Sequence, residues 1–463
     1  MTIKEQVIKS QKSQIELSRT LAKVGYDSKI GQTLRLRLYY QDGFLLLRKF
    51  KSFLYTAKEV FGDKFFGGDQ AIIHTSHAEV KKLMQVEPQQ RGNDLGIIRM
   101  LAPSYLLNNP LSLGMNGTQH TGARALFLQA LPDPAEDIEN LSNLVDGCLS
   151  EAAQKNELQI AKDLPRMMLK ILHQVVFQIS LSEEEVTAST GYNKKLFLAS
   201  LPDFINKYTL GLLTAPSVKH RQQLTQRYKQ SPLWSSYVET GAKYNLNEHQ
   251  IANSLFDMIH IAGTLGTSAL LGSTIGVLCL DEALRNQVIA EVNTVWNEQE
   301  TPNADALTNS ILTNKVILET ARLYPAVRFV SQLAKESGEV EIGETKCPFQ
   351  KGTRLLGSIF TANRDAARYK NPDSFDIERD YSDILSWNGH GHERACPGRD
   401  LSIGLIIIFV LYLFKKYKWQ SITEVKWEFE KVTAVTPNEL VLQGFARKLG
   451  IGHWGLGMGD WAW

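Results

Sequence analysis

The sequence lacks several features that would place it in a common class at once. Its longest apolar run, residues 403–414, has twelve residues, whereas a membrane-spanning helix needs roughly 20. Residues 1–20 have no apolar core, so we expect neither a signal peptide nor a membrane anchor. The formal net charge is only +2 in 463 residues. This small value argues against a nucleic-acid partner, because nucleic-acid-binding proteins usually carry a strong basic excess.

Cysteine is also scarce, with four residues in the chain: Cys148, Cys279, Cys347 and Cys396. None is at CxxC spacing, and no cluster of cysteine and histidine resembles a zinc site. Four cysteines are too few for a disulfide framework, so we expect a reducing, cytoplasmic location. The first two lie in helix-like stretches and are expected to be small buried hydrophobes. No chemical role is expected for Cys347.

The pattern along the chain is mainly helical. Apolar residues make up 43% of the chain and charged residues 22%, which is an ordinary globular balance. Short strand-like segments are confined to residues 66–76, 327–335 and 338–356, and residues 363–398 form a long loop of functional character. The pattern therefore predicts one mostly α domain with small β-sheets. Helices are predicted at 44–61, 141–153, 164–179, 247–280, 282–298, 312–323 and 403–414.

The segment SWNGHGHERACPGRDLSIGL, residues 386–405, surrounds the remaining cysteine. Its glycines allow the main chain to pass close to a flat ligand, and Arg394 can offer a guanidinium to a carboxylate. A cysteine near the start of a helix has its thiolate stabilised by main-chain N–H groups and the helix dipole. A thiolate on haem iron favours O–O cleavage. A cysteine before a helix is more often structural, but these neighbours favour Cys396 as an iron ligand.

Further motifs occur in a fixed order. Glu319-Thr-Ala-Arg322 places an acid and a base one helical turn apart, and LYPAV, Asn-Arg-Asp and NPDSFDIERD follow it. In this order the chain resembles the cytochrome P450s. The resemblance implies that Glu319, Arg322 and Arg379 form a buried structural network that holds the cysteine loop. It also implies that His120 and Arg124, one turn apart, face the propionates of a haem b cofactor, together with Arg394.

The resemblance implies a single-domain cytochrome P450 fold over residues 30–449. Residues 1–29 are then an N-terminal extension, and residues 450–463 form a tail rich in tryptophan and glycine. In the family, an arginine after the ExxR helix often meets a propionate. Gln332 occupies that position here, and Arg328 is the candidate replacement, with a surface arginine as the alternative.

The cysteine loop departs from the family pattern. Cytochrome P450s usually have a phenylalanine seven residues before the cysteine and a glycine four residues before it. These positions are Gly389 and His392 here, and Trp387 lies two residues too early to replace the phenylalanine. We therefore expect a longer or differently folded loop and an altered tuning of the iron. Families that use peroxides also alter this loop.

The predicted central helix carries HIAGTLGTSALL, where the family has an acid followed by a threonine. Alignment on Ala262 puts Leu265 at the acid and Gly266 at the threonine. Alignment on Gly263 puts Gly266 at the acid and keeps Thr267 as an alcohol. The carboxylate is missing in both alignments. Since the acid and the alcohol order a water chain that delivers protons, ordinary dioxygen activation should be slow or use other groups.

Gly266, Thr267 and His260 are therefore the candidate catalytic positions on this helix. An aspartate one turn earlier, His260 itself or a water molecule are the open alternatives for the missing acid. The small residues Ala262 and Gly263 are expected beside the haem, because a helix that passes over it must let ligands approach.

The resemblance implies a haem-thiolate oxidoreductase of specialised metabolism, with non-standard oxygen activation and a hydrophobic small-molecule substrate. Three chemistries remain open. The first is monooxygenation with electrons from a ferredoxin or flavoprotein. The second is conversion of fatty-acid hydroperoxides, or peroxygenase activity. The third is oxidative coupling of aromatic rings. A non-catalytic haem-binding sensor or carrier is the alternative from another class.

Overall fold

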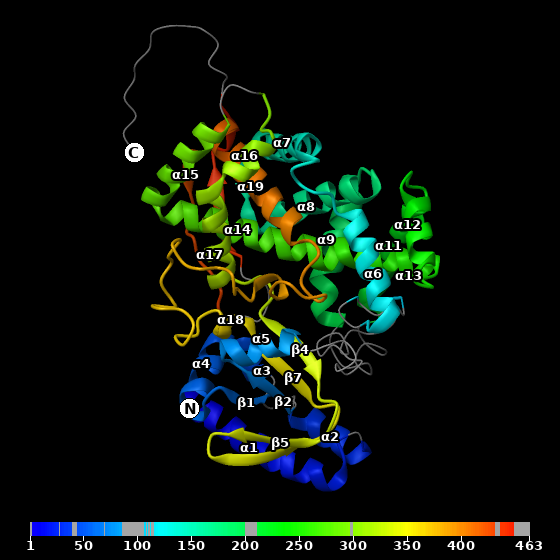
Figure 1. Ribbon diagram of the computed structural model, residues 1–463, viewed down its shortest axis with the longest axis vertical. Helices are drawn as coiled ribbons and strands as arrows, with labels where there is room; N and C mark the ends of the chain where they lie inside the picture. Colours follow the sequence, from blue (N-terminus) through cyan, green and yellow to red (C-terminus); the bar gives the residue numbers. More distant parts are fainter. Residues whose placement is uncertain are drawn as a thin grey trace.

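The computed structural model describes residues 2–26, 28–38, 44–68, 70–85, 106–107, 109, 112, 115–199, 211–296, 300–430 and 436–448. Helices form most of the molecule, and a smaller part with a β-sheet lies at one end (Figure 1). The predicted fold class, mostly α with small sheets, is therefore confirmed. The predicted tail at 450–463 lies outside the described residues.

At each predicted helix the structure has helical residues whose ends agree to within a few positions, and the predicted helix at 44–61 is divided into α3 and α4. The first helices are α1 (Ile3–Val24), α2 (Lys29–Leu38), α3 (Phe44–Arg48), α4 (Phe50–Phe61), α5 (His77–Gln85), α6 (Gly117–Ala130), α7 (Ile138–Gln154), α8 (Ile160–Phe177), α9 (Glu183–Ala199), α11 (Gly211–Tyr228) and α12 (Trp234–Ala242). The later ones are α13 (Glu248–Asp257), η6 (Met258–Gly263), α14 (Thr264–Leu280), α15 (Glu282–Val295), α16 (Ala304–Asn309), α17 (Ile311–Leu323), α18 (Ile359–Ala362), η7 (Ser386–Asn388) and α19 (Arg399–Lys416). The strands are β1 (Lys64–Gly67), β2 (Ala71–His74), β3 (Glu157–Gln159), β4 (Phe329–Leu333), β5 (Gly338–Ile342), β6 (Thr345–Phe349), β7 (Arg354–Ser358), β8 (Tyr417–Lys418), β9 (Ser421–Ile422), β10 (Val441–Gln443) and β11 (Ala446–Arg447).

Helix α1 covers most of the predicted N-terminal extension and packs on the sheet-containing part. It begins with a capping box, in which the Thr2 hydroxyl accepts from the Glu5 N–H and the Glu5 carboxylate accepts from the Thr2 N–H. The Gln11 amide exchanges two hydrogen bonds with the main chain of Phe66 on β1, at 2.6 and 2.9 Å. Val7 is fully buried in the same apolar cluster as the sheet. The segment is thus joined to the fold by specific contacts.

The largest sheet has the strand order β1-β2-β7-β4. Strands β2 and β7 are parallel and pair Ile73 with Leu356, whereas the outer pairs are antiparallel. All four residues of β2 are buried, as expected for a strand covered on both faces. The hairpin of β5 and β6 turns at Gly343, whose φ of +58° favours glycine.

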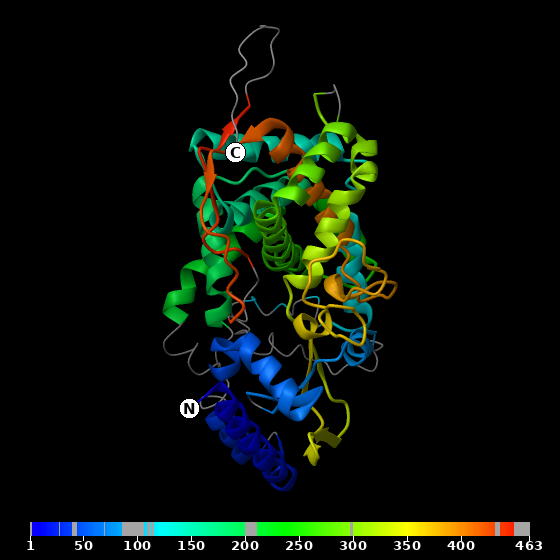
Figure 2. The same ribbon diagram turned by 90° about the vertical axis from the view of Figure 1, so that its left-hand side faces the viewer.

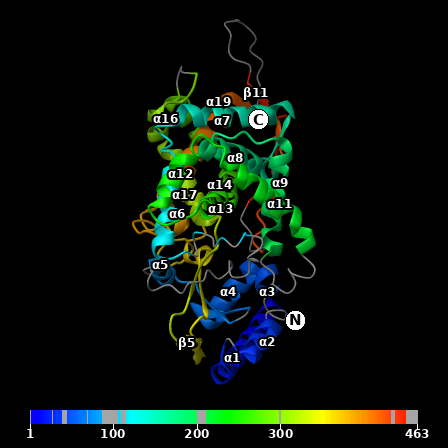
Figure 3. The same ribbon diagram turned by 90° about the vertical axis from the view of Figure 1, so that its right-hand side faces the viewer.

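A continuous helical stretch, α13-η6-α14, runs through the helical part, and Figures 2 and 3 show it end-on with other helices around it. It starts at the capping box of Asn247 and Gln250. In its middle, η6 is a π-helical turn in which the N–H of Thr264 donates to the carbonyl of Ile259. Such turns are frequent at functional sites. Among the described residues, this stretch alone is long and apolar enough to span a membrane, but 72% of its most apolar window is buried inside the protein.

The predicted apolar helix at 403–414 lies within α19, which packs on α7, α15, α17 and α14. Gly404 allows the closest approach, because a Cβ there would lie 2.4 Å from the Cβ of Pro134. This packing fixes the N-terminal end of α19, where the cysteine loop joins it.

Candidate haem-thiolate site

Cys396 lies in the loop between η7 and α19, two residues before Gly398, the N-cap of α19. Its main-chain N–H donates to the carbonyl of Trp387 at 2.8 Å, which closes the loop between them. Burial raises the pKa of the Cys396 thiol, while the N–H of Gly398 and the Arg124 guanidinium act in the opposite direction. Burial thus opposes ionisation of the sulfur, and a bound metal cation would favour its thiolate form.

Two contacts join α6 to the residues just before the cysteine. Arg124 donates from Nη1 to the carbonyl of Ala395 at 2.6 Å. Arg394 donates from Nη2 to the side-chain oxygen of Asn116, the N-cap of α6, at 2.8 Å. His120 is buried one turn before Arg124 on the same helix. The structure thus brings Arg124 and Arg394 together at the cysteine loop, with His120 on the adjoining turn.

These groups fit a haem. The Nε of Arg394 is buried and has no hydrogen-bond partner in the described part of the chain, and burial lowers the pKa of this guanidinium. A buried donor without an acceptor is costly, and a carboxylate such as a haem propionate matches it. Cys396 offers a sulfur ligand of the kind that holds haem iron.

The buried ion network lies between α17 and the loop that leads to the cysteine. Glu319 and Arg322 are fully buried and form a bidentate pair at 2.7 and 2.8 Å. Arg379 donates from Nε to the same carboxylate at 3.1 Å, and the N–H of Asp376 donates to it at 2.9 Å. The two guanidiniums also donate to carbonyls of the loop, including that of Ser374. The structure thus brings the three predicted network residues together.

A second set of bonds carries this support to the cysteine loop. Arg322 donates from Nη1 to the carbonyl of Asn363 at 2.8 Å. The Asn363 side chain accepts from the N–H of Leu385 and donates to the hydroxyl of Ser386. The Ser386 hydroxyl donates to the carbonyl of Ala321 on α17, at 2.7 Å. The start of the cysteine loop is therefore tied directly to the ExxR helix.

One face of the central helix is open. Ala262 is exposed, and a methyl group on Gly266 would contact nothing within 4 Å among the described residues. Leu265 is half-buried beside them. Residues four apart share a face of a helix, so this open face carries alanine, leucine and glycine. It favours the alignment anchored on Ala262, in which neither the acid nor the alcohol of the family is present.

Three other candidates on this helix do not reach the open face. A Cβ on Gly263 would lie 2.7 Å from the Leu172 side chain of α8, so this glycine faces α8. Thr267 is buried, with 7% exposure. His260 is fully buried, stacks on Phe256 at 3.7 Å between ring centroids and has Nε2 3.2 Å from the Ser189 hydroxyl. Burial lowers the pKa of His260 far below its usual value, so its ring is neutral.

Arg328 lies just before β4 and is only 3% exposed, so the alternative of a surface arginine is wrong. Its guanidinium lies over the ring of Phe50 at 4.6 Å and over that of Phe360 at 5.5 Å. Burial lowers its pKa to about 10. These contacts place it in the aromatic cluster beside the sheet, and its predicted role toward a propionate stays a prediction.

Three asparagines of the site were not predicted from the sequence: Asn116, Asn363 and Asn388. The available signal for Asn116 was its place before Gly-Thr at a helix start, which is typical of an N-cap. Asn363 stands in the Asn-Arg-Asp motif, and Asn388 follows the tryptophan of the cysteine loop. Composition alone does not separate such residues from ordinary turn formers.

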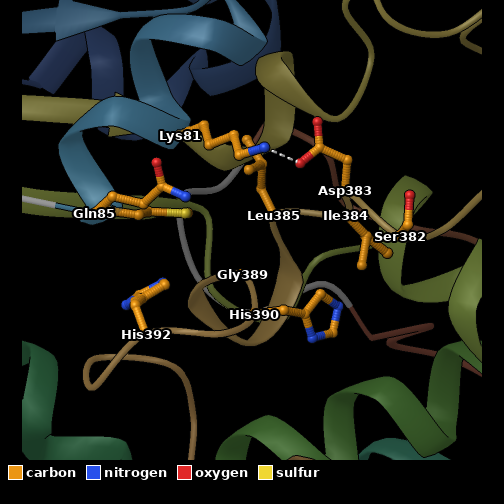
Figure 4. Close-up of a pocket in the computed structure, with 10 residues that line it drawn as sticks. Lys81, Gln85, Ser382, Asp383, Ile384, Leu385, Gly389, His390 and His392 are labelled. Atoms are coloured by element: carbon orange, nitrogen blue, oxygen red, sulfur yellow. Dashed lines mark hydrogen bonds and ion pairs between the residues drawn. The ribbon is translucent and has the colours of Figure 1, made fainter.

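A small pocket lies beside the cysteine loop, between α5 and residues 382–392 (Figure 4). Lys81 and Asp383 form an ion pair at its edge, and His390 and His392 also line it. Its volume of about 100 Å³ is smaller than the roughly 150 Å³ of a protein cavity that accepts benzene. The pocket is therefore too small for a hydrophobic substrate.

Comparison with known proteins agrees with this geometry. The profile of the family described as "Cytochrome P450" matches residues 206–442, which include the ExxR helix and Cys396. The chain belongs to the cytochrome P450 family. The predicted haem b cofactor, which this family binds, is confirmed with it. The roles of the individual residues stay predictions.

Three members of the family match this chain at low sequence identity. The chain is 23% identical over 338 residues to carnosic acid synthase from Rosmarinus officinalis, covering 63% of this chain and 65% of that protein. It is 24% identical over 308 residues to amorpha-4,11-diene 12-monooxygenase from Artemisia annua, covering 64% and 60%. It is also 24% identical over 204 residues to the divinyl ether synthase CYP74M3 from Selaginella moellendorffii, covering 39% and 41%.

The matches span less than two thirds of the length of each of these relatives. A crystal structure of a cytochrome P450, CYP102L1, superimposes with a TM-score of 0.65 at 16% identity and covers 82% of this chain and 93% of that one. This likeness confirms the cytochrome P450 fold.

Proposed function

We propose that this protein is a haem-thiolate oxidoreductase that acts on a hydrophobic small molecule and receives oxygen from a peroxide or an organic hydroperoxide. The observation that carries the proposal is the open face of the central helix. Ala262, Leu265 and Gly266 form this face, and none of the three side chains can donate or accept a proton. Family members that activate dioxygen use an acid and an alcohol there.

The chain's own residues would hold the cofactor in a defined way. Cys396 would ligate the iron, and Arg394 would donate from its unpartnered Nε to a propionate. Arg124 fixes the carbonyl just before the cysteine and so orients the ligand. When bound, the haem supplies the redox chemistry, and its thiolate ligand favours O–O cleavage.

Two polar side chains of this helical stretch are committed elsewhere. The Ser268 hydroxyl donates to the carbonyl of Thr264 at 2.6 Å, and both residues are buried. Asp257 is held by Arg221 through two bonds, at 2.7 and 3.2 Å. The three residues of the open face would themselves supply no proton for dioxygen reduction. A peroxide already carries a reduced O–O bond, so it makes a smaller demand on proton delivery.

Monooxygenation with an electron donor is the second candidate. The names of several relatives favour it, such as amorpha-4,11-diene 12-monooxygenase and 11-hydroxysugiol 20-monooxygenase from Salvia miltiorrhiza. It requires a ferredoxin or flavoprotein partner, whereas the peroxide route does not.

The two candidates are separated by measuring turnover with each oxidant. We expect product from a hydrophobic substrate with hydrogen peroxide or an organic hydroperoxide, and little with a ferredoxin, its reductase and dioxygen. The double variant Leu265→Asp/Gly266→Thr restores the acid and the alcohol on the open face, and donor-supported turnover should rise. Ser268→Ala, which removes a hydroxyl already bonded within the helix, is the matched control. Rapid donor-supported turnover by the wild type, unchanged in the double variant, would contradict the proposal.

A further inference from the structure

The turn before Cys396 has an unusual main-chain path. Four of its residues have positive φ: Trp387 at 57°, Asn388 at 61°, Gly389 at 74° and Gly391 at 71°. Left-handed backbone is uncommon outside glycine, although asparagine adopts it more readily than most residues. A tryptophan in this region is sterically strained. The surrounding contacts must therefore stabilise the turn.

Those contacts converge on Arg394, Ala395 and the proposed iron ligand, Cys396. The N–H of Arg394 donates to Nδ1 of His392 at 3.2 Å, and its carbonyl accepts from the Asn388 side chain at 2.7 Å. The N–H of Ala395 donates to the carbonyl of His392 at 3.0 Å. The Ala395 carbonyl accepts from Arg124, and the Cys396 N–H donates to the Trp387 carbonyl. Every main-chain polar group from the Arg394 N–H to the Cys396 N–H therefore has a partner.

The hydrogen bonds fix the state of the His392 ring. Its Nδ1 accepts from the N–H of Arg394, so this nitrogen carries no proton. Its Nε2 lies 2.8 Å from the carbonyl of Asn388, which accepts only, so this nitrogen carries the proton. The ring is therefore neutral and bridges both ends of the turn. Asn388 completes the bridge from the other end through its side chain.

We propose that Asn388 and His392 form a clamp that positions Arg394 and Cys396 for the haem. His392 stands where the family has a glycine, and the clamp holds a turn that the family pattern does not describe. Both are positioning residues, because they act on the haem through the main chain of Arg394. The proposal rests on the haem-thiolate site, and it holds for any substrate or oxidant.

The same turn supplies an internal control. His390 lies two residues from His392 and lines the same small pocket, and no hydrogen bond of its ring is recorded in the described structure. If His392 only filled space, replacing His392 and replacing His390 would have equal effects. If the clamp positions the loop, only His392 matters.

Four single variants of the haem-loaded protein test the proposal. His392→Phe keeps an aromatic ring without hydrogen bonds, and His392→Asn keeps an acceptor near the position of Nδ1. Asn388→Gly removes the side-chain donor and retains the left-handed backbone. His390→Phe is the matched control. The measurements are haem transfer to excess apomyoglobin, the reduced carbon monoxide spectrum and the urea midpoint of unfolding.

We expect haem release to become roughly 10- to 100-fold faster in His392→Phe, the range typical of lost support around a metal ligand. Its carbon monoxide spectrum should lose part of the red-shifted band of thiolate ligation. Asn388→Gly should change in the same direction, while His392→Asn and His390→Phe should stay near the wild type. Failure of His392→Phe to retain haem, with His392→Asn retaining it, also supports the clamp.

Wild-type haem release and spectrum in both His392→Phe and Asn388→Gly would overturn the proposal. Equal damage in His390→Phe and His392→Phe would overturn it too. Turnover is not among the measurements, so inactivity with every oxidant would count against the proposed function and leave this result intact.

Discussion

Replacing Glu319 by glutamine removes the charge at the centre of the buried ion network and keeps its shape. The wild-type carboxylate accepts two bonds from Arg322, one from Arg379 and one from the N–H of Asp376, at 2.7 to 3.1 Å. Both Glu319 and Arg322 have no exposed side-chain surface. The variant therefore leaves the buried Arg322 guanidinium without its counter-charge, and it removes from Arg379 the nearer of two carboxylates, the other being that of Asp376 at 4.0 Å.

The expected loss in the free energy of unfolding follows from that burial. Removing one partner of a buried ion pair costs about 3–5 kcal/mol, because the remaining charge is uncompensated. The glutamine oxygen still accepts some of the bonds, and both guanidiniums keep their carbonyl acceptors. We therefore expect the lower end, a loss of about 3 kcal/mol in the free energy of unfolding. Typical domains have only about 5–15 kcal/mol in total, so haem retention should fall as well.

Urea unfolding followed by tryptophan fluorescence and by the haem absorbance measures both effects. The matched control is Glu378→Gln. Glu378 pairs at 2.8 Å with Lys315, which lies on the same helix as Glu319, but both side chains of this pair are solvent-exposed. Such surface pairs contribute about 0–1 kcal/mol. A loss in Glu319→Gln no larger than that of the control would refute the argument that the network supports the loop.

Three further predictions concern other parts of the fold. Arg221 holds the fully buried Asp257 and ties α11 to α13, so Arg221→Leu should lower the free energy of unfolding by about 3–5 kcal/mol. Urea unfolding measures this loss, and adding Asp257→Asn should recover part of it. Burial lowers the pKa of His173 from 6.5 to about 4. Since the unfolded chain binds this proton at a higher pH than the folded protein, the free energy of unfolding should fall as the pH drops from 6.5 to 4, by up to about 3 kcal/mol from this residue. In His173→Gln the free energy of unfolding should depend less steeply on pH over this range, and an unchanged pH dependence would contradict the lowered pKa of His173. Gly404→Ala should destabilise the protein by about 1–3 kcal/mol, because the new methyl group overlaps Pro134. Thermal unfolding measures this loss. Ala269→Gly, a cavity-forming change on another helix, is the comparison that separates the clash from a general loss of packing.

The sequence was most informative where chemistry and order along the chain coincide. The apolar period of residues 403–414 and 312–323 located α19 and α17, because a buried helix needs apolar residues on most of its faces. The acid and the base of the ExxR motif are one turn apart by helix geometry alone, so their contact could be anticipated. The third member, Arg379, was placed by the family order, and the structure brings it to the same carboxylate.

Other features depend on packing that no local pattern encodes. Two alignments of the central helix differed by one residue, and only the packing of Gly263 against Leu172 and the open space at Gly266 favours one of them. The π-helical turn η6 shifts the faces of this helix and has no simple sequence signature. His260 was a catalytic candidate because it could replace the missing acid, yet it is buried among other side chains.

The path of the loop before Cys396 also could not be predicted from the sequence. The shifted Trp387 and the histidine in place of a glycine predicted a different loop, but not its path. That path depends on several left-handed residues and on side chains that bond the main chain across the turn. Arg328 likewise was chosen only as the nearest arginine that could replace the one missing at Gln332, and the two aromatic rings over its guanidinium, of Phe50 and Phe360, come from separate segments.

The central claim is that Cys396 holds haem iron as a thiolate. The most direct test is the carbon monoxide difference spectrum of the reduced protein, recorded for the wild type, Cys396→Ser and His120→Ala. The account predicts the red-shifted Soret band of thiolate-ligated haem in the wild type and in His120→Ala, and its loss in Cys396→Ser. Absence of that band from the wild type, or loss of haem on the histidine replacement with Cys396→Ser unaffected, would contradict it.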